Sequence, residues 1–303
     1  MGSMQAELPD GWQRADRPQR PVLFVNPRSG GGKATRTGLV DRARERGIEA
    51  ITLTRDRSLA ALVEDAVTGG ADALGVAGGD GSMAVVAGAA RAHGLPFVCI
   101  PAGTRNHFAR DLGVDPAEPV GALAAFADGV ERRIDVAEVN GRMFLNNVSL
   151  GVYGDAVRRP AYRDAKLRTL LEAANEALRP GAAAPELELV DDQGREHRHP
   201  AVVLVSNNPY VLDRPLAPGT RAALDSGTLG VIVLEALLTQ PDPPPRMWSA
   251  TSLQVDGAAP VHAGIDGEAV ELVPPLLFVS RPATLRVAVP SPHSAPARPQ
   301  AQD

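Results

Sequence analysis

Short apolar runs alternate with helix-length segments from Pro21 to about residue 130, and this alternation restricts the fold more than any other feature of the chain. The runs read PVLFVN, IEAITLT, ADALGVAG and PFVCIP, and each precedes a loop and a helical segment. Strands separated by helices of about a dozen residues are typical of a parallel sheet with helices on both faces. We therefore expect an α/β domain over residues 21–134.

The pattern changes after Arg133, where short strand-like runs follow one another with Gly, Asp and Pro between them. Asn140-Gly141 is a strong hairpin signal, and a helical stretch is expected from Tyr162 to Leu178. This pattern predicts an antiparallel β-sandwich or barrel over residues 135–290. The polar segments 1–20 and 291–303 are expected to be disordered tails.

Composition excludes several classes of function. The net charge of −5 leaves no basic excess to meet a phosphate backbone, so we expect no nucleic-acid partner. No apolar run approaches the length of a membrane-spanning helix, so a soluble, cytoplasmic protein is expected, peripheral at the membrane if it contacts one. The single cysteine, Cys99, lies in an apolar run and is expected to be a buried structural thiol.

Three loops follow the predicted parallel strands, NPRSGGGK (26–33), GGDGS (78–82) and PAGTRNHF (101–108). Ligands of open α/β sheets bind outside these strand ends, where glycine-rich turns at helix N-termini offer backbone N–H groups to phosphate. A carboxylate beside polyphosphate is costly unless it holds Mg²⁺ or handles a proton, which is the role we infer for Asp80. Each loop could singly be a plain turn, and none is a P-loop or a G-x-G-x-x-G turn.

The segments VNPRSGGGKA, GVAGGDGS and PAGTRNHFARDLGV, followed by RRIDVAEVNGRMFLNNVSLGVYG, LDSGTLGVIVL and GIDGEAVEL, together resemble the diacylglycerol kinase catalytic domain family. This family includes bacterial soluble lipid kinases and sphingosine and ceramide kinases. The resemblance covers about residues 21–290. It implies an N-terminal α/β domain related to phosphofructokinase and NAD kinase, a C-terminal β-sandwich, and ATP and Mg²⁺ as cofactors.

The resemblance also assigns roles to particular positions. Glu268 matches the general base on the lipid hydroxyl, with Asp266 and Asp135 as its neighbours on the substrate side. Asp135 could equally cap a strand at the domain joint. The positions implied to bind the nucleotide are Asn26, Pro27, Ser29, Gly30, Thr54, Gly78, Gly79, Asp80, Gly81, Ser82, Gly103, Thr104 and Asn106.

The chain departs from the family pattern at several positions. Ala84 and Val85 replace a polar Asn-Glu pair, which puts nucleotide affinity or choice in doubt. His107 stands where Asp is common, and either a phosphate contact or a plain exposed side chain fits it. Family members hold a structural Mg²⁺ at an Asp-Asp-Gly turn. Here Asp225 remains as the candidate ligand but Ser226 replaces the second carboxylate, so the site is expected to be weak or absent.

These observations predict an ATP-dependent lipid kinase that phosphorylates a hydroxyl of a diacylglycerol-like lipid. A NAD kinase-like enzyme and a catalytically silent lipid- or nucleotide-binding protein are the alternatives. The helix expected within residues 156–180 could lie on an anionic membrane or pack on the sandwich. Trp248, in the segment 239–250, could be interfacial or partly buried. An exposed sandwich edge could pair two copies into a homodimer.

Overall fold

The computed structural model describes residues 8, 10–151, 186–198, 200–211, 221–235 and 246–292. The chain divides into two compact units, residues 1–134 with 285–303, and residues 135–284. The helix expected at Tyr162–Leu178 and the start of the segment 239–250 lie outside the described residues.

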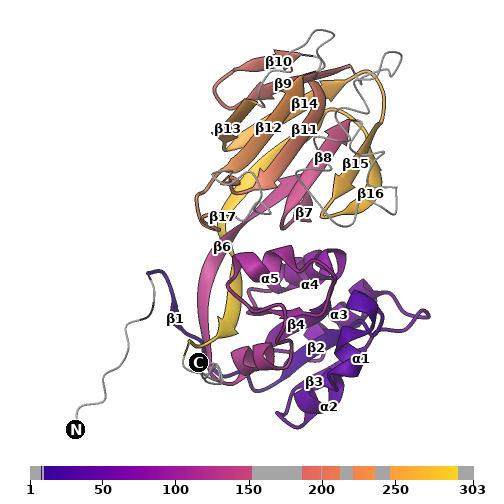
Figure 1. Ribbon diagram of the computed structural model, residues 1–303, viewed down its shortest axis with the longest axis vertical. Coiled ribbons are helices and arrows are strands. Elements are labelled where there is room, and N and C mark those ends of the chain that lie inside the picture. The colour runs from indigo at the N-terminus through magenta and orange to yellow at the C-terminus, as the bar shows by residue number, and fades with distance from the viewer. Residues whose placement is uncertain are drawn as a thin grey trace, which may run out of the picture. The chain divides into compact units, whose positions relative to one another are not determined.

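A parallel sheet forms the centre of the first unit, as the alternation of strands and helices predicts (Figure 1). The sheet runs in the order β3-β2-β4-β5, and the end of β17 adds in parallel beside β5. The strands of this unit are β1 (Gln13–Arg14), β2 (Pro21–Val25), β3 (Glu49–Thr52), β4 (Ala73–Gly78), β5 (Phe97–Pro101) and the start of β6 (Gly129–Val139). Because β2, β4 and β5 are buried over their whole length, their sequences are continuous apolar runs instead of alternating ones.

Helices follow the parallel strands. They are α1 (Lys33–Arg36), α2 (Leu39–Arg44), α3 (Leu59–Thr68), α4 (Asp80–Ala92) and α5 (His107–Asp111), with 3-10 turns η1 (Ser29–Gly31) and η2 (Gly121–Phe126). The hydroxyl of Ser58 accepts a hydrogen bond from the backbone N–H of Ala61 at 3.2 Å, so Ser58 is the N-cap of α3, a position for which serine is a favoured residue. The segment after the first loop forms two short helices, α1 and α2, because Gly38 between them has a left-handed φ of 59°.

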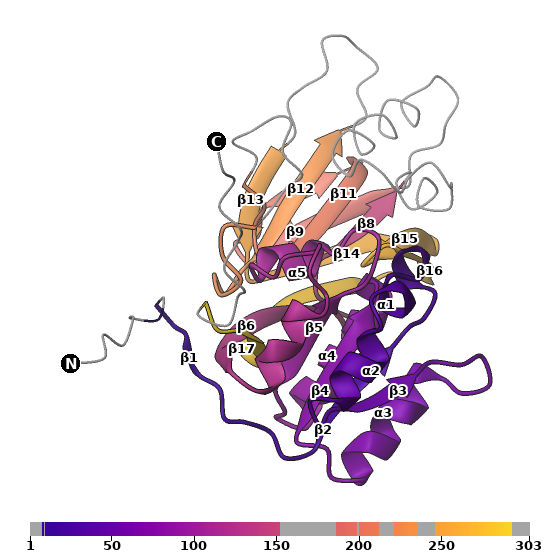
Figure 2. The same cartoon turned by 60° about the horizontal axis from the view of Figure 1, so that its bottom comes forward.

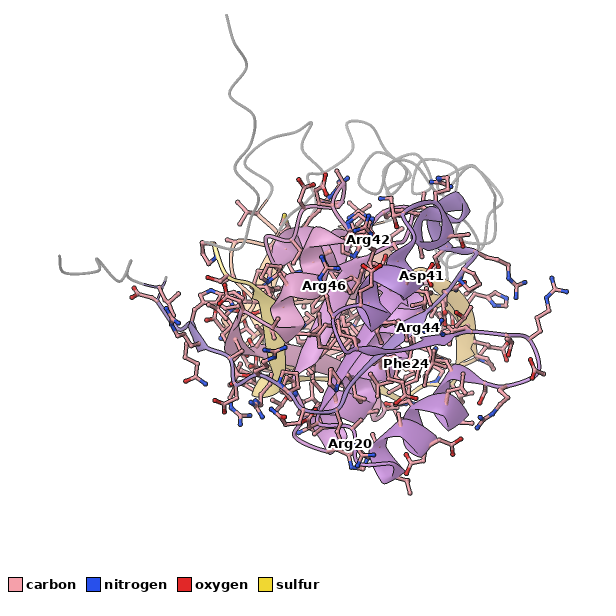
Figure 3. The ribbon with its side chains drawn as sticks, turned by 90° about the horizontal axis from the view of Figure 1, so that it is seen from below. Arg20, Phe24, Asp41, Arg42, Arg44 and Arg46 are labelled. Carbon is pink, nitrogen blue, oxygen red and sulfur yellow. The ribbon has the colours of Figure 1, made fainter. Side chains whose placement is uncertain are left out.

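Short helix α2 shows how the first unit separates its core from its surface. Leu39 and Ala43 are buried, whereas the intervening charged residues are exposed. Seen from below, Phe24 of β2 lies among the interior side chains, and Arg42 and Arg44 come from α2 (Figure 3). Asp41 and Glu45 flank these arginines in the sequence and are exposed too, so the outer surface of α2 carries mixed charge.

The unit boundaries differ from the expected ones at both ends of the chain. Gln13 and Arg14, within the segment expected to be a loose tail, pair with β6 as strand β1. Residues from Leu285 onward belong to the first unit, although the sequence pattern placed them in the sandwich. The physical reason is that β17 (Leu276–Pro290) is one long strand, and its end pairs with β5 through Val287 and Ala288.

The second unit is built from antiparallel strands, as predicted (Figure 2). One sheet has the order β13-β12-β11-β8-β15-β16, and the other joins β10, β9, β14 and the start of β17. The strands are β7 (Arg142–Phe144), β8 (Asn147–Gly151), β9 (Leu187–Asp191), β10 (Glu196–Arg198), β11 (Pro200–Asn207), β12 (Leu229–Glu235), β13 (Arg246–Ala250), β14 (Ser252–Gly257), β15 (Val261–Ile265) and β16 (Glu268–Leu272).

One apolar core fills the second unit, and both of its sheets contribute to it. Phe144 and Phe278 meet edge to face in it with ring centroids 6.4 Å apart. Trp248 packs against this core half-buried and stacks on His197 at 4.4 Å. The predicted hairpin is present, since Asn140 (φ 48°) and Gly141 (φ 79°) connect β6 to β7 in the left-handed conformation that a type I′ turn requires.

The expectations for the single cysteine and for membrane-spanning helices concern residues that the structure describes. Cys99 is 2% exposed, so the buried thiol is confirmed. Burial raises the pKa of this thiol far above its ordinary value, and the nearby charge of Asp80 raises it further. Among the described helices, none combines the length and the apolar character needed to cross a bilayer.

The hairpin between β9 and β10 yields a prediction about acid stability. Burial alone would raise the pKa of Asp191, but hydrogen bonds from Arg195 and Gln193 outweigh it and hold the pKa below 3.8. Asp191→Asn should therefore cost about 1–3 kcal/mol of unfolding free energy at neutral pH, because the buried amide keeps one acceptor oxygen for the three N–H donors of Gln193 and Arg195.

The disadvantage of Asp191→Asn should shrink as the pH falls below the ordinary pKa of a carboxyl group, because the unfolded wild-type chain takes up a proton there first, and it should vanish once the pH has fallen through the lowered pKa of folded Asp191. Urea unfolding at a series of pH values measures this. Glu188→Gln, on the same strand, is the control, because its ion pair with Arg198 is half-exposed and should contribute under about 1 kcal/mol. An equal cost for Asp191→Asn at every pH would contradict the prediction.

Candidate functional site

The first loop leaves β2 and turns sharply through glycines. The backbone N–H of Asn26 donates to the carbonyl of Ala77 at 2.8 Å, and the side-chain oxygen of Asn26 accepts from the N–H of Arg28 at 3.0 Å. Gly30, Gly31 and Gly32 follow with φ of 56°, 64° and 83°. Only glycine adopts this conformation readily in succession, so the run of three glycines is required by the path of the backbone.

The third loop, after β5, is held by Asn106. This residue is 4% exposed, and its side chain both accepts from the N–H of Gly103 and donates to the carbonyl of Gly103, each at 2.8 Å. Thr104 is exposed between them, and His107 begins α5 half-buried. Asn106 therefore fixes the loop internally instead of projecting into solvent.

Close backbone contacts bring the three loops together. A Cβ on Gly30 would lie 2.5 Å from the carbonyl oxygen of Ala102 and 3.0 Å from that of Gly103. A Cβ on Gly103 would in turn lie 2.9 Å from the carbonyl oxygen of Gly78 and 3.0 Å from Cα of Gly79. The predicted convergence of these loops at the carboxyl edge of the sheet is therefore present in the first unit.

Gly79 differs from Gly30 and Gly103, because no described atom requires it to be glycine. Its φ of −91° suits any residue, and a Cβ there would meet nothing within 4 Å. It is the N-cap residue of the 13-residue helix α4, whose first three residues are Asp80, Gly81 and Ser82. Open space at a helix N-terminus beside a carboxylate is what a phosphate with its cation requires.

Other predicted nucleotide positions lie around this edge. Pro27 and Ser29 are half-buried in the first loop. Thr54 is exposed beyond the end of β3, and its hydroxyl bonds to Asp56, which lowers the pKa of that carboxyl below its ordinary value. On α4, Ala84 is half-buried and Val85 is 40% exposed, so the replaced polar pair lies on the outer side of the helix.

The acidic residues of the second unit fall into exposed and buried sets. Asp266 and Gly267 have φ of 48° and 88° and form the turn between β15 and β16, after which Glu268 begins β16. The Glu268 side chain is 61% exposed, with one carboxylate oxygen 3.8 Å from Nη2 of Arg142. Asp266 is buried, and its carboxylate bonds to backbone N–H groups.

Asp135 is buried and joins two distant segments. Its carboxylate accepts from the N–H of Gly227 at 2.7 Å and from that of Ala283 at 2.9 Å, and its own N–H donates to Leu224 at 2.8 Å. These contacts are those of a residue that fastens a strand, which was one of the two alternatives for this position. A role toward substrate stays a prediction.

The residues at the expected structural cation site do not fit a cation. The hydroxyl and the N–H of Ser226 both donate to Oδ1 of Asn208, at 2.6 and 2.8 Å, so hydrogen bonds already close this turn. Asp225 is exposed beside it. Within the described ranges no cluster of three or more His, Cys, Asp or Glu side chains could hold a metal. No role for a cation at Asp225 is therefore derived.

Sequence reasoning missed the buried polar residues that support these turns, chiefly Asn146, Asn207, Asn208 and Arg221. A signal was present, because the pairs Asn146-Asn147 and Asn207-Asn208 interrupt apolar strand ends where polar side chains are otherwise rare. Buried polar groups in such positions generally hold irregular backbone.

Comparison with known proteins agrees with this geometry. The family described as "Diacylglycerol kinase catalytic domain" matches residues 20–139, which contain all three loops. The resemblance seen in the sequence is confirmed, since this part of the chain matches the model of that family.

Curated relatives point the same way. A Pseudomonas aeruginosa protein named "Probable lipid kinase YegS-like" is 38% identical over 149 residues, 48% of each chain. A diacylglycerol kinase of Mycobacterium tuberculosis is 32% identical over 122 residues, 39% of this chain and 40% of that one. The chain thus spans at most about half the length of the curated relatives it matches.

Solved structures share the fold over nearly the whole chain. A crystal structure of a diacylglycerol kinase from Bacillus anthracis has a TM-score of 0.64 at 16% identity, covering 93% of this chain and all of that one. A second crystal structure from that organism reaches 0.68 at 19% identity, with 92% of this chain covered. At this identity the likeness establishes the fold: an α/β domain and an antiparallel sandwich, as predicted.

The contact between the first and third loops can be tested by stability. Gly30→Ala places a methyl group 2.5 Å from a carbonyl oxygen and forces a left-handed alanine. Gly38→Ala is the matched control, with the same left-handed φ of 59° but nothing within 4 Å. Gly30→Ala should lower the unfolding free energy by about 1–3 kcal/mol more than Gly38→Ala does. Equal costs in thermal unfolding would show that the loops are not packed this closely.

Proposed function

We propose that this protein is an ATP- and Mg²⁺-dependent lipid kinase that transfers the γ-phosphoryl group to a hydroxyl of a diacylglycerol-like lipid, met at the membrane surface. The observation that carries the proposal is the convergence of three glycine-bearing loops at the start of α4. They lie in the segment that matches the diacylglycerol kinase catalytic family.

In this proposal the first unit binds the phosphates of ATP. The N–H groups at the start of α4 and the open space at Gly79 suit a phosphate group, and the hydroxyls of Ser82 and Thr104 can add hydrogen bonds. Mg²⁺ in phosphoryl-transfer sites is commonly held by one or two carboxylates together with substrate phosphates and water. The single carboxylate of Asp80 fits that donor set. When bound, Mg²⁺ neutralises charge on the transferring phosphoryl group.

In this proposal the second unit supplies the general base that accepts the proton of the lipid hydroxyl. In the transfer, the lipid hydroxyl oxygen forms a bond to the γ-phosphorus, the bond from that phosphorus to the bridging oxygen of ADP breaks, and the hydroxyl proton goes to the Glu268 carboxylate. Glu268 is suited to this role because it is exposed, at the first position of a strand that follows a tight turn. Asp266, although only two residues away, is already occupied by backbone N–H groups.

The catalytic assignment is tested with labelled lipid. The pure protein is incubated with γ-labelled ATP, Mg²⁺ and a total lipid extract, and the products are separated by chromatography. One labelled lipid is expected, and Glu268→Gln should reduce its formation by on the order of 10²–10⁴-fold. Glu271→Gln, an exposed acid on the same strand, should leave it unchanged.

Other outcomes of that assay favour the alternatives. Phosphorylation of NAD without any labelled lipid would favour the NAD kinase-like enzyme. ATP binding without turnover on any acceptor would favour a silent binding protein, for which the apolar pair Ala84-Val85 is the motivating feature. An undiminished rate in Glu268→Gln would falsify the general-base assignment alone.

The phosphate assignment has its own test at Gly79. Because a Cβ there meets no described atom, Gly79→Ala should leave thermal stability almost unchanged. It should weaken ATP binding about tenfold or more, since the methyl group occupies the space assigned to phosphate. Titration calorimetry with ATP and Mg²⁺ measures this. Unchanged affinity would place the phosphates elsewhere.

A further inference from the structure

Residues 145–147 lie buried where β7 ends and β8 begins: Leu145 and Asn146 form a short bend, and Asn147 is the first residue of β8. Buried backbone outside a regular sheet needs partners for its N–H and carbonyl groups. Here one side chain supplies all the acceptors. Asp266 Oδ2 accepts from the N–H of Leu145 at 2.8 Å, and Oδ1 accepts from those of Asn146 and Asn147 at 2.7 and 3.1 Å.

The same segment is held from its carbonyl side by Arg221. This guanidinium is 5% exposed, and its Nη1 donates to the carbonyls of Leu145 and Asn207 at 2.5 and 2.8 Å. Its Nη2 donates to Oδ1 of Asn146 at 3.3 Å. The side-chain amide of Asn207 adds a second donor to the Leu145 carbonyl at 3.2 Å. The segment is therefore clamped between a buried anion and a buried cation.

The clamp also fixes the turn that carries Glu268. The N–H of Asp266 donates to the carbonyl of Asn147 at 2.9 Å, so both backbone and side chain of Asp266 hold the same segment. Gly267 follows, and Glu268 begins β16 opposite Ile265. The turn is closed by the pairing of Ile265 with Glu268, and the hydrogen bonds of Asp266 tie it to residues 145–147. The carboxylate of Asp266 therefore acts together with the β15–β16 pairing to hold the backbone of Glu268 in place.

We propose that Asp266 is a positioning residue that acts through Glu268, with Arg221 as its support on the opposite side of residues 145–147. This inference rests on the proposed role of Glu268 as the base. It assigns to the two acids of the Asp-Gly-Glu turn different tasks: the buried one accepts three backbone hydrogen bonds and the exposed one meets the substrate. Asp266 does not contact the lipid.

The test uses Asp266→Asn in the full-length protein. An amide has one acceptor oxygen, so at least one N–H of residues 145–147 loses its partner, and hydrogen exchange of these amides should accelerate at least tenfold. Asp256→Asn is the matched control, because it makes the same chemical change at a carboxylate bonded to the side chain of Gln254. It should leave exchange at residues 145–147 unchanged.

Kinetics with the labelled lipid separate positioning from contact. Displacement of the base lowers kcat, by on the order of 10²-fold for a shift of about 1 Å, while KM for the lipid and for ATP stays within twofold. A raised KM for the lipid with kcat retained would show direct contact and overturn the proposal. Unchanged kcat despite faster exchange would also overturn it.

Arg221→Lys provides a second variant if Asp266→Asn does not fold. A lysine keeps the charge but loses the fork that reaches two carbonyls and Asn146, so the same fall in kcat and the same faster exchange are expected. If the wild-type protein phosphorylates no lipid, the proposed function fails and the positioning role with it. The exchange measurement still decides the clamp, because slow exchange retained in both variants would show that the clamp does not exist.

Discussion

The candidate nucleotide site depends on how closely Gly103 approaches the loop after β4. Its Cα lies so near the carbonyl of Gly78 and Cα of Gly79 that no side-chain atom fits between them. Gly30 makes the equivalent contact on the other side, against Ala102 and Gly103. Three loops that are far apart in sequence thus form one surface of backbone groups. A surface of this kind offers donors at fixed positions without paying side-chain entropy, which suits recognition of phosphate.

In the second unit, buried polar side chains hold the loop backbone in place, whereas in the first unit close contacts at glycines do so. The backbone of residues 145–147 and 225–228 is hydrogen-bonded by the side chains of Asp266, Arg221, Asp135 and Asn208. Such a network is stable only when every member is paired, because an unpaired buried charge costs far more than a lost contact. Ser226 fits this logic, since its hydroxyl completes the turn by bonding to Asn208 where a carboxylate would require a cation.

The fold could be predicted from the sequence because the patterns that indicate it involve residues close together in the chain. Buried parallel strands read as apolar runs, Ser58 reads as a helix cap, and Asn140-Gly141 reads as a hairpin. The three loops could be grouped because parallel strands end at one edge. The sequence could not predict that the side chain of Asn106 bonds to Gly103, or that the carboxylate of Asp266 accepts from the N–H groups of residues 145–147. These hydrogen bonds depend on how the folded chain packs. Strand β17 was misassigned at its end for the same reason: its pairing with β5 joins residues nearly 200 positions apart.

The replaced pair Ala84-Val85 bears on function more than on fold. Helix α4 buries Met83, Val86, Ala87 and Ala90 toward the sheet, whereas Val85 lies 40% exposed on the opposite side. Polar residues at positions 84 and 85 would contribute little to packing, so their loss costs the helix little. The loss of these polar side chains should therefore affect a ligand bound at the exposed side of the first turns of α4, and not the packing of the helix. Because Gly79 and Asp80 begin this same helix, the replacement changes the surroundings of the proposed phosphate site while leaving the carboxylate and the open helix N-terminus in place.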